Sequence, residues 1–269
     1  MPASATWCPH CGRPGLFPNV RAAETVAERN ALAERYSLSV EAAAVRGCAE
    51  VLRSFEDSAC SSKAVIARPL AQTEQLTCSD DQLYSTYYKL IEAEVRLPSG
   101  DKWDVLRRVA DAILFPGYEK EIRFAALSMD GIGASTYGEC SLVLRDSMIA
   151  HRASVFEGNS AWLLKQWRYD LTSGFRATWE QRSMLCVAKL AAQLQAEATP
   201  EDFAEILLCP GPIAEEGRFV EVHILRGLTR RSLEKVMIAS PPRGGRPGST
   251  RLKALRDRLA EAGVAFEVS

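Results

Sequence analysis

The spacing of apolar positions divides the chain into a helical first part and a strand-rich second part. Up to about residue 115, apolar side chains recur three and four positions apart, as Val45, Cys48, Leu52 and Phe55 do. This spacing is typical of one face of a helix. The pattern predicts helices over 19–36 and 39–55, one beginning at residue 80 or 81, one from about 103 to 115, and a short strand over 64–67.

After residue 116, short alternating runs replace most of the helical pattern. Alternation predicts strands over 122–128, 137–144, 219–225, 235–239 and 264–268, and helical spacing predicts helices over 178–195, 199–209 and around 252–259. Helices lead and strands follow, without the regular alternation of βαβ units, so the predicted fold class is α+β. We predict two regions: a helical accessory region over 1–115 and a sheet-forming core over 116–269.

Composition places the chain among ordinary globular proteins. It has 269 residues, of which 47% are hydrophobic and 25% charged, and this length can bury a sizeable core. No apolar run approaches the roughly 18 residues that cross a bilayer, and the first residues lack the basic and apolar regions of a secretory signal. We therefore expect a cytoplasmic protein without membrane contact, whose eight irregularly spaced cysteines are reduced.

Charge is distributed unevenly although the formal net charge is only −1. Residues 218–269 contain eleven Lys or Arg and five acids, a local balance of +6. Such a segment suits a polyanionic partner, and it equally suits a solvated basic surface. The residues that would contact a phosphate backbone are Arg226, Arg230, Arg231, Arg243, Arg246 and Arg251.

The run Cys8-Pro-His-Cys11-Gly resembles one half of a zinc ribbon or knuckle. Two cysteines at this spacing bend around one metal ion, but a structural zinc site needs four ligands. The nearby donors that could complete it are Cys48, Cys60 and Cys78. A terminus without metal fits the same residues, whereas redox chemistry is poorly supported because no strand precedes the motif.

Two other motifs are weaker. The loop from Asp130 to Gly133 lacks the glycine spacing and the following helix of a dinucleotide-binding turn. Cys140 and Cys186 could be nucleophiles beside a histidine, but both fall at positions that the pattern assigns to the core. We therefore predict neither a dinucleotide-binding turn nor a cysteine nucleophile.

Glu221 and His223 share one face of the predicted strand over 219–225. Period-two geometry places Val220, Val222 and Ile224 on the opposite face. If the Val/Ile face packs on the core, Glu221 and His223 stand together on a more open face. A solvent-facing amphipathic strand gives the same alternation, so the pattern alone leaves both interpretations open.

The strand that carries Glu221 resembles a segment of the mono-ADP-ribosyltransferase superfamily, in particular of its bacterial toxin-like members. It is followed by the turn Gly227-Leu-Thr and a short Val/Ile strand that ends near Ile238, as in the segment that carries the catalytic glutamate of that superfamily. The sequence departs from the pattern at Phe219, where Gln or Glu is common. This departure argues against the classical arginine-directed type of protein target.

A second stretch is similar to the same superfamily. Tyr137-Gly begins a strand, and Arg152-Ala-Ser leads to Gly-Asn-Ser160, which resembles the Tyr-Gly strand and the Arg-x-Ser/Thr…Gly-Asp-Ser segment of some bacterial members. Asn159 stands where that pattern has Asp. Together the two stretches extend from about residue 120 to the end of the chain.

The resemblance implies an ADP-ribosyltransferase-like split β-sheet core that uses NAD as co-substrate, with Glu221 as the catalytic carboxylate. Cleavage of the nicotinamide–ribose bond passes through an oxocarbenium-like state, which a carboxylate stabilises. Arg152 would grip the pyrophosphate bidentately, unless it forms a surface ion pair. The other implied NAD contacts are Ser154, Asn159 and Ser160 to a ribose or the nicotinamide amide, Tyr137 to a ring, and Arg123 as the first-strand residue.

These assignments give two hypotheses of different classes. The first is an NAD-dependent ADP-ribosyltransferase, a toxin or defence effector that modifies nucleic acid or protein and is held in check by an antitoxin or inhibitor protein. The second is a non-catalytic module that binds nucleic acid or protein through the zinc knuckle and the basic C-terminal surface. Binding or hydrolysis of NAD separates the two.

Overall fold

In the computed structural model, residues 17–84, 102–209, 218–238 and 249–268 are described, and their strands form one eight-stranded sheet. The order is β5-β4-β6-β2-β1-β3-β7-β8, antiparallel except for the parallel pair β7 and β8. The strands are β1 (Lys63–Arg68), β2 (Ile122–Ser128), β3 (Cys140–Leu144), β4 (Ala153–Phe156), β5 (Arg176–Thr178), β6 (Glu221–Leu225), β7 (Leu233–Ile238) and β8 (Ala265–Val268).

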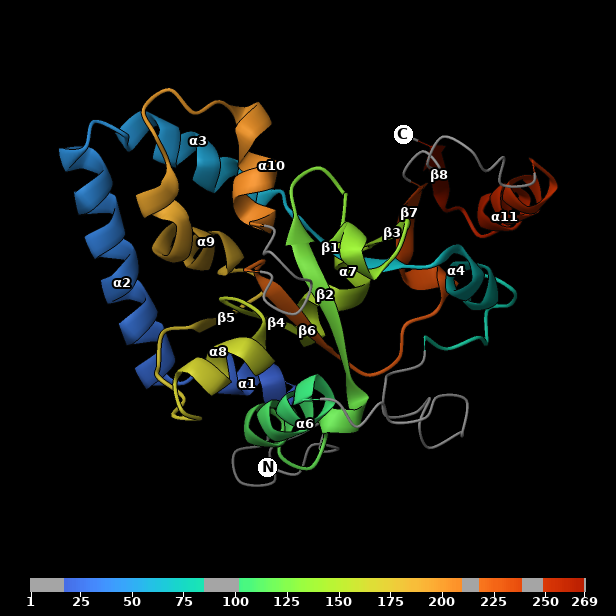
Figure 1. Ribbon diagram of the computed structural model, residues 1–269, viewed down its shortest axis with the longest axis horizontal. Helices are drawn as coiled ribbons and strands as arrows, with labels where there is room; N and C mark the ends of the chain where they lie inside the picture. The colour runs from blue at the N-terminus through green and yellow to red at the C-terminus, as the bar shows by residue number, and fades with distance from the viewer. Residues whose placement is uncertain (1–16, 85–101, 210–217, 239–248, 269) are drawn as a thin grey trace.

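Helices cover both faces of the sheet, so the predicted α+β class is confirmed (Figure 1). They are α1 (Pro18–Ala23), α2 (Val26–Val45), α3 (Ala49–Cys60), α4 (Leu70–Leu76), α6 (Lys102–Leu114), α7 (Asp146–Ile149), α8 (Ser160–Gln166), α9 (Arg182–Leu190), α10 (Pro200–Leu208) and α11 (Ser249–Glu261). Short 3-10 turns lie at Glu119–Glu121, Ser135–Tyr137, Ala150–Arg152, Ala191–Gln193 and Arg230–Ser232.

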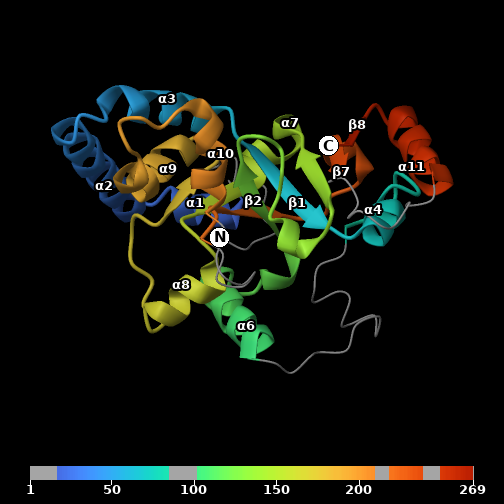
Figure 2. The ribbon, with the colours of Figure 1, turned by 45° about the horizontal axis from the view of Figure 1, so that its top comes forward.

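The two faces of the central strands belong to two separate apolar clusters. On one face, Val222 and Ile224 of β6 join the core formed with α3, α9 and α10. On the other face, Leu225 and Phe156 join a smaller cluster with α6 and α8. Figure 2 shows α6 and α8 together on one side of the sheet and α3, α9 and α10 on the other. The more open or solvent-facing position expected for Glu221 and His223 is therefore wrong, because β6 is buried along its whole length.

Helix α2 corrects the predicted division of the first helices at residues 36–39. Ser39 does not cap a new helix but lies within α2, where its hydroxyl donates to the carbonyl of Ala188. The break comes later, at Gly47, whose φ of +74° is in the left-handed region. Glycine adopts that conformation without the steric penalty of a side chain and commonly ends helices.

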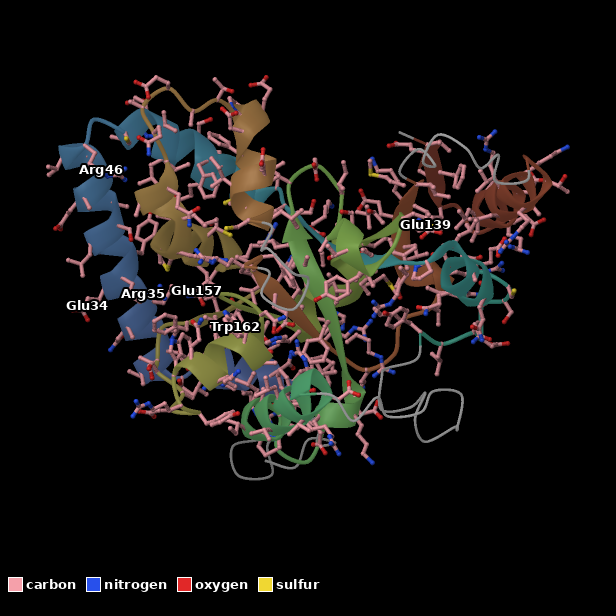
Figure 3. All side chains as sticks on the ribbon, viewed as in Figure 1. Glu34, Arg35, Arg46, Glu139, Glu157 and Trp162 are labelled. Carbon is pink, nitrogen blue, oxygen red and sulfur yellow. The ribbon has the colours of Figure 1, made fainter. Side chains whose placement is uncertain are left out.

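The sheet draws strands from both sides of the predicted boundary at 115/116. β1 lies between β2 and β3 and pairs with both. Helix α2 is also tied to the second region: Glu28 accepts from Gly174 N at 2.6 Å, and Arg35 pairs with Glu157 at 2.5 Å. Figure 3 shows Arg35 and Glu157 close together between α2 and the central sheet.

None of the helices in the described parts of the chain has the length and apolarity needed to cross a bilayer.

Candidate active site

Glu221 begins β6, in the middle of the sheet between β4 and β2. The predicted alternation is confirmed, because Val220, Val222 and Ile224 lie in the large core while Glu221 is directed to the other face with His223. The Glu221 residue is only 2% exposed. A carboxylate buried this deeply requires compensating donors.

Three donors meet the Glu221 carboxylate. Arg107 Nη2 donates to Oε1 at 3.0 Å, and the backbone N–H of Ser160 donates to Oε2 at 2.9 Å. The Nε2 of His223 lies 3.0 Å from Oε2; because an ionised carboxylate only accepts, Nε2 carries the proton of this hydrogen bond. The carboxylate is thus oriented from α6, from the start of α8 and from its own strand.

The pKa of Glu221 lies well below its ordinary value. Burial works to raise this pKa, but the positive charge of Arg107 and the hydrogen bonds from His223 and Ser160 outweigh burial. Opposite charge and donated hydrogen bonds both favour the ionised form. Glu221 therefore stays a carboxylate at neutral pH.

Arg107 connects Glu221 to the start of α8. Its Nη1 donates to Ser160 Oγ at 2.9 Å, and its Nη2 donates to Asn159 Oδ1 at 3.2 Å. The Asn159 side chain also caps α8 by accepting from two backbone N–H groups of the first turn. Asn159 and Ser160, which the resemblance assigns to NAD, therefore lie beside Glu221, and their side chains accept hydrogen bonds from Arg107.

His223 lies in an aromatic enclosure. Its ring centroid is 4.9 Å from that of Phe115, 5.4 Å from Phe124 and 5.9 Å from Phe156. The prediction that His223 would stand on an open face is therefore wrong: the side chain is buried, because α6 and the segment after it cover this face of the sheet. The aromatic contacts and the hydrogen bond to Glu221 together fix the orientation of the His223 ring.

A pocket of about 310 Å³ adjoins this cluster, at the lower end of the range typical of small-molecule sites. Its lining includes Glu221, Arg107, Asn159, Tyr137 and Phe219. The rings of Tyr137 and Phe219 meet edge to face, with centroids 6.5 Å apart. The pocket thus combines an ionised carboxylate, a guanidinium and aromatic surface.

Arg123, which the resemblance implies as the first-strand residue, lines the pocket. Arg123 lies on β2, is 1% exposed, and donates from Nη1 to the carbonyl of Glu121 at 2.7 Å. Arg68, at the end of β1, lines the pocket together with Arg123. Arg68 is half-buried and lies over the ring of Tyr84 at 5.3 Å.

Arg152 and Ser154 do not belong to the residues that line the pocket. Arg152 donates to the carbonyl oxygens of Met148, Leu225 and Gly227. Ser154 Oγ accepts from the side chain of Asn19 on α1 at 3.3 Å. The alternative of a surface ion pair for Arg152 is wrong, because the guanidinium is buried against backbone carbonyls.

Arg107 is the residue that sequence reasoning missed. Helical spacing shows Arg107 and Asp111 as an i, i+4 pair beside the buried stripe of α6, a pattern that normally marks a solvated ion pair. Asp111, however, is 0% exposed. The Arg107 and Asp111 pair beside the apolar stripe is the feature of the sequence that could have indicated a buried arginine. The residues that Arg107 contacts on β6 and α8 are distant in sequence, so no local pattern connects them.

The predicted metal ligands Cys8 and Cys11 lie outside the described residues. Of the proposed additional ligands, Cys60 and Cys78 are exposed, and buried Cys48 donates from Sγ toward Leu194 O at 3.7 Å. Within the described ranges, no group of three or more His, Cys, Asp or Glu is placed to hold a metal ion.

The alternative cysteine nucleophiles are buried. Burial raises the pKa of Cys140 to about 11 and that of Cys186 to about 12. Because the thiolate is the nucleophile, thiols with such pKa values are poorly reactive at neutral pH.

Most of the described arginines that were expected to contact a phosphate backbone are paired with acids. Arg230 and Arg231 both contact Asp80, and Arg251 contacts Glu74. Arg226 lies over the Phe17 ring at 5.2 Å. Arg243 and Arg246 lie outside the described residues.

Comparison with known proteins returns no match, either to a model of a protein family or to a curated protein sequence.

Proposed function

We propose that the protein is an NAD-dependent ADP-ribosyltransferase in which Glu221 is the catalytic carboxylate. The observation that carries the proposal is a buried, ionised Glu221 on the wall of a pocket. The resemblance of the Glu221 strand and of the segment 137–160 to mono-ADP-ribosyltransferases supplies the reaction class, including the ADP-ribosyltransferase-like split-sheet core.

The chemistry requires a negative charge where a positive charge develops. The bond between ribose C1 and the nicotinamide nitrogen breaks, and its electron pair leaves with nicotinamide. The remaining ribosyl oxocarbenium ion is attacked by a nucleophilic atom of the acceptor, which then releases a proton. Glu221 would accept a hydrogen bond from a ribose hydroxyl and stabilise the cation electrostatically.

Glu221 retains room for that hydrogen bond. Two carboxylate oxygens offer about four acceptor positions, and three donors among the described residues occupy three of them. Oε1, which takes one hydrogen bond from Arg107, is the oxygen we assign to the ribose hydroxyl. Arg68 would contact the phosphates of NAD, since a guanidinium binds phosphate oxygens well, and Tyr137 would stack on a ring.

The biological role follows the same resemblance: a toxin or defence effector acting on nucleic acid or protein, with an antitoxin or inhibitor as partner. Because Arg230, Arg231 and Arg251 are engaged with acids, the structure gives no preference for a nucleic-acid acceptor. A non-catalytic binding module has no chemical need for the buried charge of Glu221. The buried charge therefore supports the enzyme over the binding module.

The test is Glu221→Gln, which keeps the volume of the side chain and removes its charge. NAD hydrolysis and transfer by the variant should fall at least about 100-fold, the scale of losing one transition-state stabiliser, while NAD still binds. Glu261→Gln, at an exposed position of α11, is the matched control and should retain full activity.

Removing one member of a buried ion pair destabilises a protein, so rates should be normalised to the folded fraction measured by near-UV circular dichroism. Wild-type rates in folded Glu221→Gln would refute the proposed catalytic role.

A further inference from the structure

Arg107 gathers four oxygen acceptors around one guanidinium. Besides Glu221 and the two residues at the start of α8, its Nη1 lies 3.5 Å from Asp111 Oδ1. The ring of Phe124 lies 4.4 Å from the central guanidinium carbon, a cation–π distance. Acceptors around the edge and a ring against the face fix both the position and the plane of the group.

We propose that Arg107 is a positioning residue for the reaction at Glu221, holding that carboxylate in the orientation that meets the ribose. This inference rests on the proposed function and deepens it. Its physical basis is geometric: Arg107 contacts Oε1 directly, and it also contacts the side chains of Asn159 and Ser160. One guanidinium therefore sets the distance between the α8 start and β6.

If Arg107 were the only charged group beside Glu221, its positive charge would weaken the attraction of the Glu221 carboxylate for an oxocarbenium ion. Here Arg107 also faces the carboxyl group of Asp111, whose Oδ1 lies 3.5 Å from Nη1, so its charge is not directed at Glu221 alone. Arg107 therefore orients Glu221 while it is shared with a second acidic side chain.

The backbone of α6, which carries Arg107, is itself anchored in the protein. Leu106, Ala110 and Leu114 of this helix are buried in the cluster that also contains Phe156 and Leu225. A backbone anchored by three buried side chains leaves the Arg107 side chain little freedom to depart. The site is therefore completed by a helix that precedes the predicted catalytic region.

The experiment compares Arg107→Met and Arg107→Lys with Arg108→Met, an exposed arginine of the same helix. With NAD as substrate, we expect Arg107→Met to lower kcat about 10- to 100-fold, the effect of a displaced catalytic group, with KM changed less than about threefold. Arg107→Lys should recover part of the rate, and Arg108→Met should match the wild type.

The double variant Arg107→Met/Glu221→Gln shows whether Arg107 acts through Glu221. If it does, the double variant should be no slower than Glu221→Gln alone, because groups that act as a unit are not additive. The acid limb of the kcat profile should also move to higher pH in Arg107→Met, a change that simple loosening of the fold does not produce. An unchanged kcat in folded Arg107→Met, or losses that multiply in the double variant, overturns the proposal.

A readout without turnover separates this inference from the proposed function. Carbon-13 labelling of glutamate, with Glu221→Gln to assign the signal, follows the titration of the Glu221 carboxyl by NMR. Arg107→Met should raise its midpoint by at least about one pH unit. If the wild type does not cleave NAD, the proposed function fails whatever the titration shows. If it does cleave NAD, an unchanged midpoint in Arg107→Met overturns the role of Arg107 and leaves the proposed function intact.

Discussion

At the scale of single residues, the site depends on how a buried charge is compensated. An isolated carboxylate in the interior would take up a proton, because its desolvation costs several kcal/mol. Glu221 instead keeps its charge through Arg107, His223 and the N–H of Ser160. Such compensation makes the native state sensitive to acid, since these partners are lost on unfolding.

This sensitivity gives a prediction for stability against pH. The pKa of Glu221 is depressed in the native state, so its stabilising contribution is fully present above the unfolded value of about 4.3 and is lost as pH falls toward the native pKa. Between about pH 4.5 and 2.5, urea unfolding should show the wild type losing stability faster than Glu221→Gln, by up to about 1.4 kcal/mol per pH unit. Glu261→Gln should follow the wild type; parallel curves for Glu221→Gln and the wild type would contradict a depressed pKa.

The sequence predicted Glu221, Asn159, Ser160 and Tyr137 as residues of one site because strand alternation and local motifs carry them, and the structure places them near one another. Sequence reasoning did not anticipate that Asn159 and Ser160 bind the protein's own Arg107. The contacts of Arg107 join α6, α8 and β6, which no local pattern brings together. The same limit applies to the α1 side chain that meets Ser154.

At the scale of elements, local patterns predicted where strands lie but not how they pair. The predicted strand over 64–67 corresponds to β1, and those over 122–128 and 219–225 correspond to β2 and β6. Alternation says nothing about neighbours, so the insertion of β1 between β2 and β3 was not predictable. The predicted helix over 178–195 is shorter, because Arg176–Thr178 forms β5 before α9 begins.

Gly138 shows how one element is fitted against another. It leads into β3 with a φ of +148°, and a Cβ at this position would overlap the backbone of Arg68 and Pro69. The close approach brings the loop with Tyr137 against the end of β1, where Arg68 lines the same pocket. A side chain at 138 would push these two pocket walls apart.

We therefore expect Gly138→Ala to lower the free energy of unfolding by at least about 3 kcal/mol, combining backbone strain with overpacking. Gly47→Ala is the control, because Gly47 also has positive φ, +74°, but a Cβ added there would meet nothing within 4 Å. It should lose only about 1 to 2 kcal/mol. Equal losses by urea denaturation would show that the overlap at Gly138 is relieved by a backbone shift.

At the scale of the whole molecule, the first part of the chain is built into the sheet. β1 occupies a central position, and α3 contributes Leu52 and Phe55 to the large core. Helix α6 supplies Arg107 to the candidate site. The helical region over 1–115 thus provides structure that the predicted core needs, in addition to any accessory role.

The last prediction tests this dependence with a fragment of residues 116–269. Without β1, the neighbouring strands β2 and β3 lose their shared partner, and two unpaired edges in the middle of a sheet favour aggregation over folding. The fragment should therefore lack a cooperative thermal transition and near-UV circular dichroism. Co-expression with residues 1–115 as a separate chain should restore both signals, because the fragment then regains β1, the apolar side chains of α3 and the Arg107 contact with Glu221. A fragment that unfolds cooperatively on its own, with NAD cleavage intact, would mean that β2 and β3 can close the gap, and would place the boundary of an autonomous catalytic domain at residue 116.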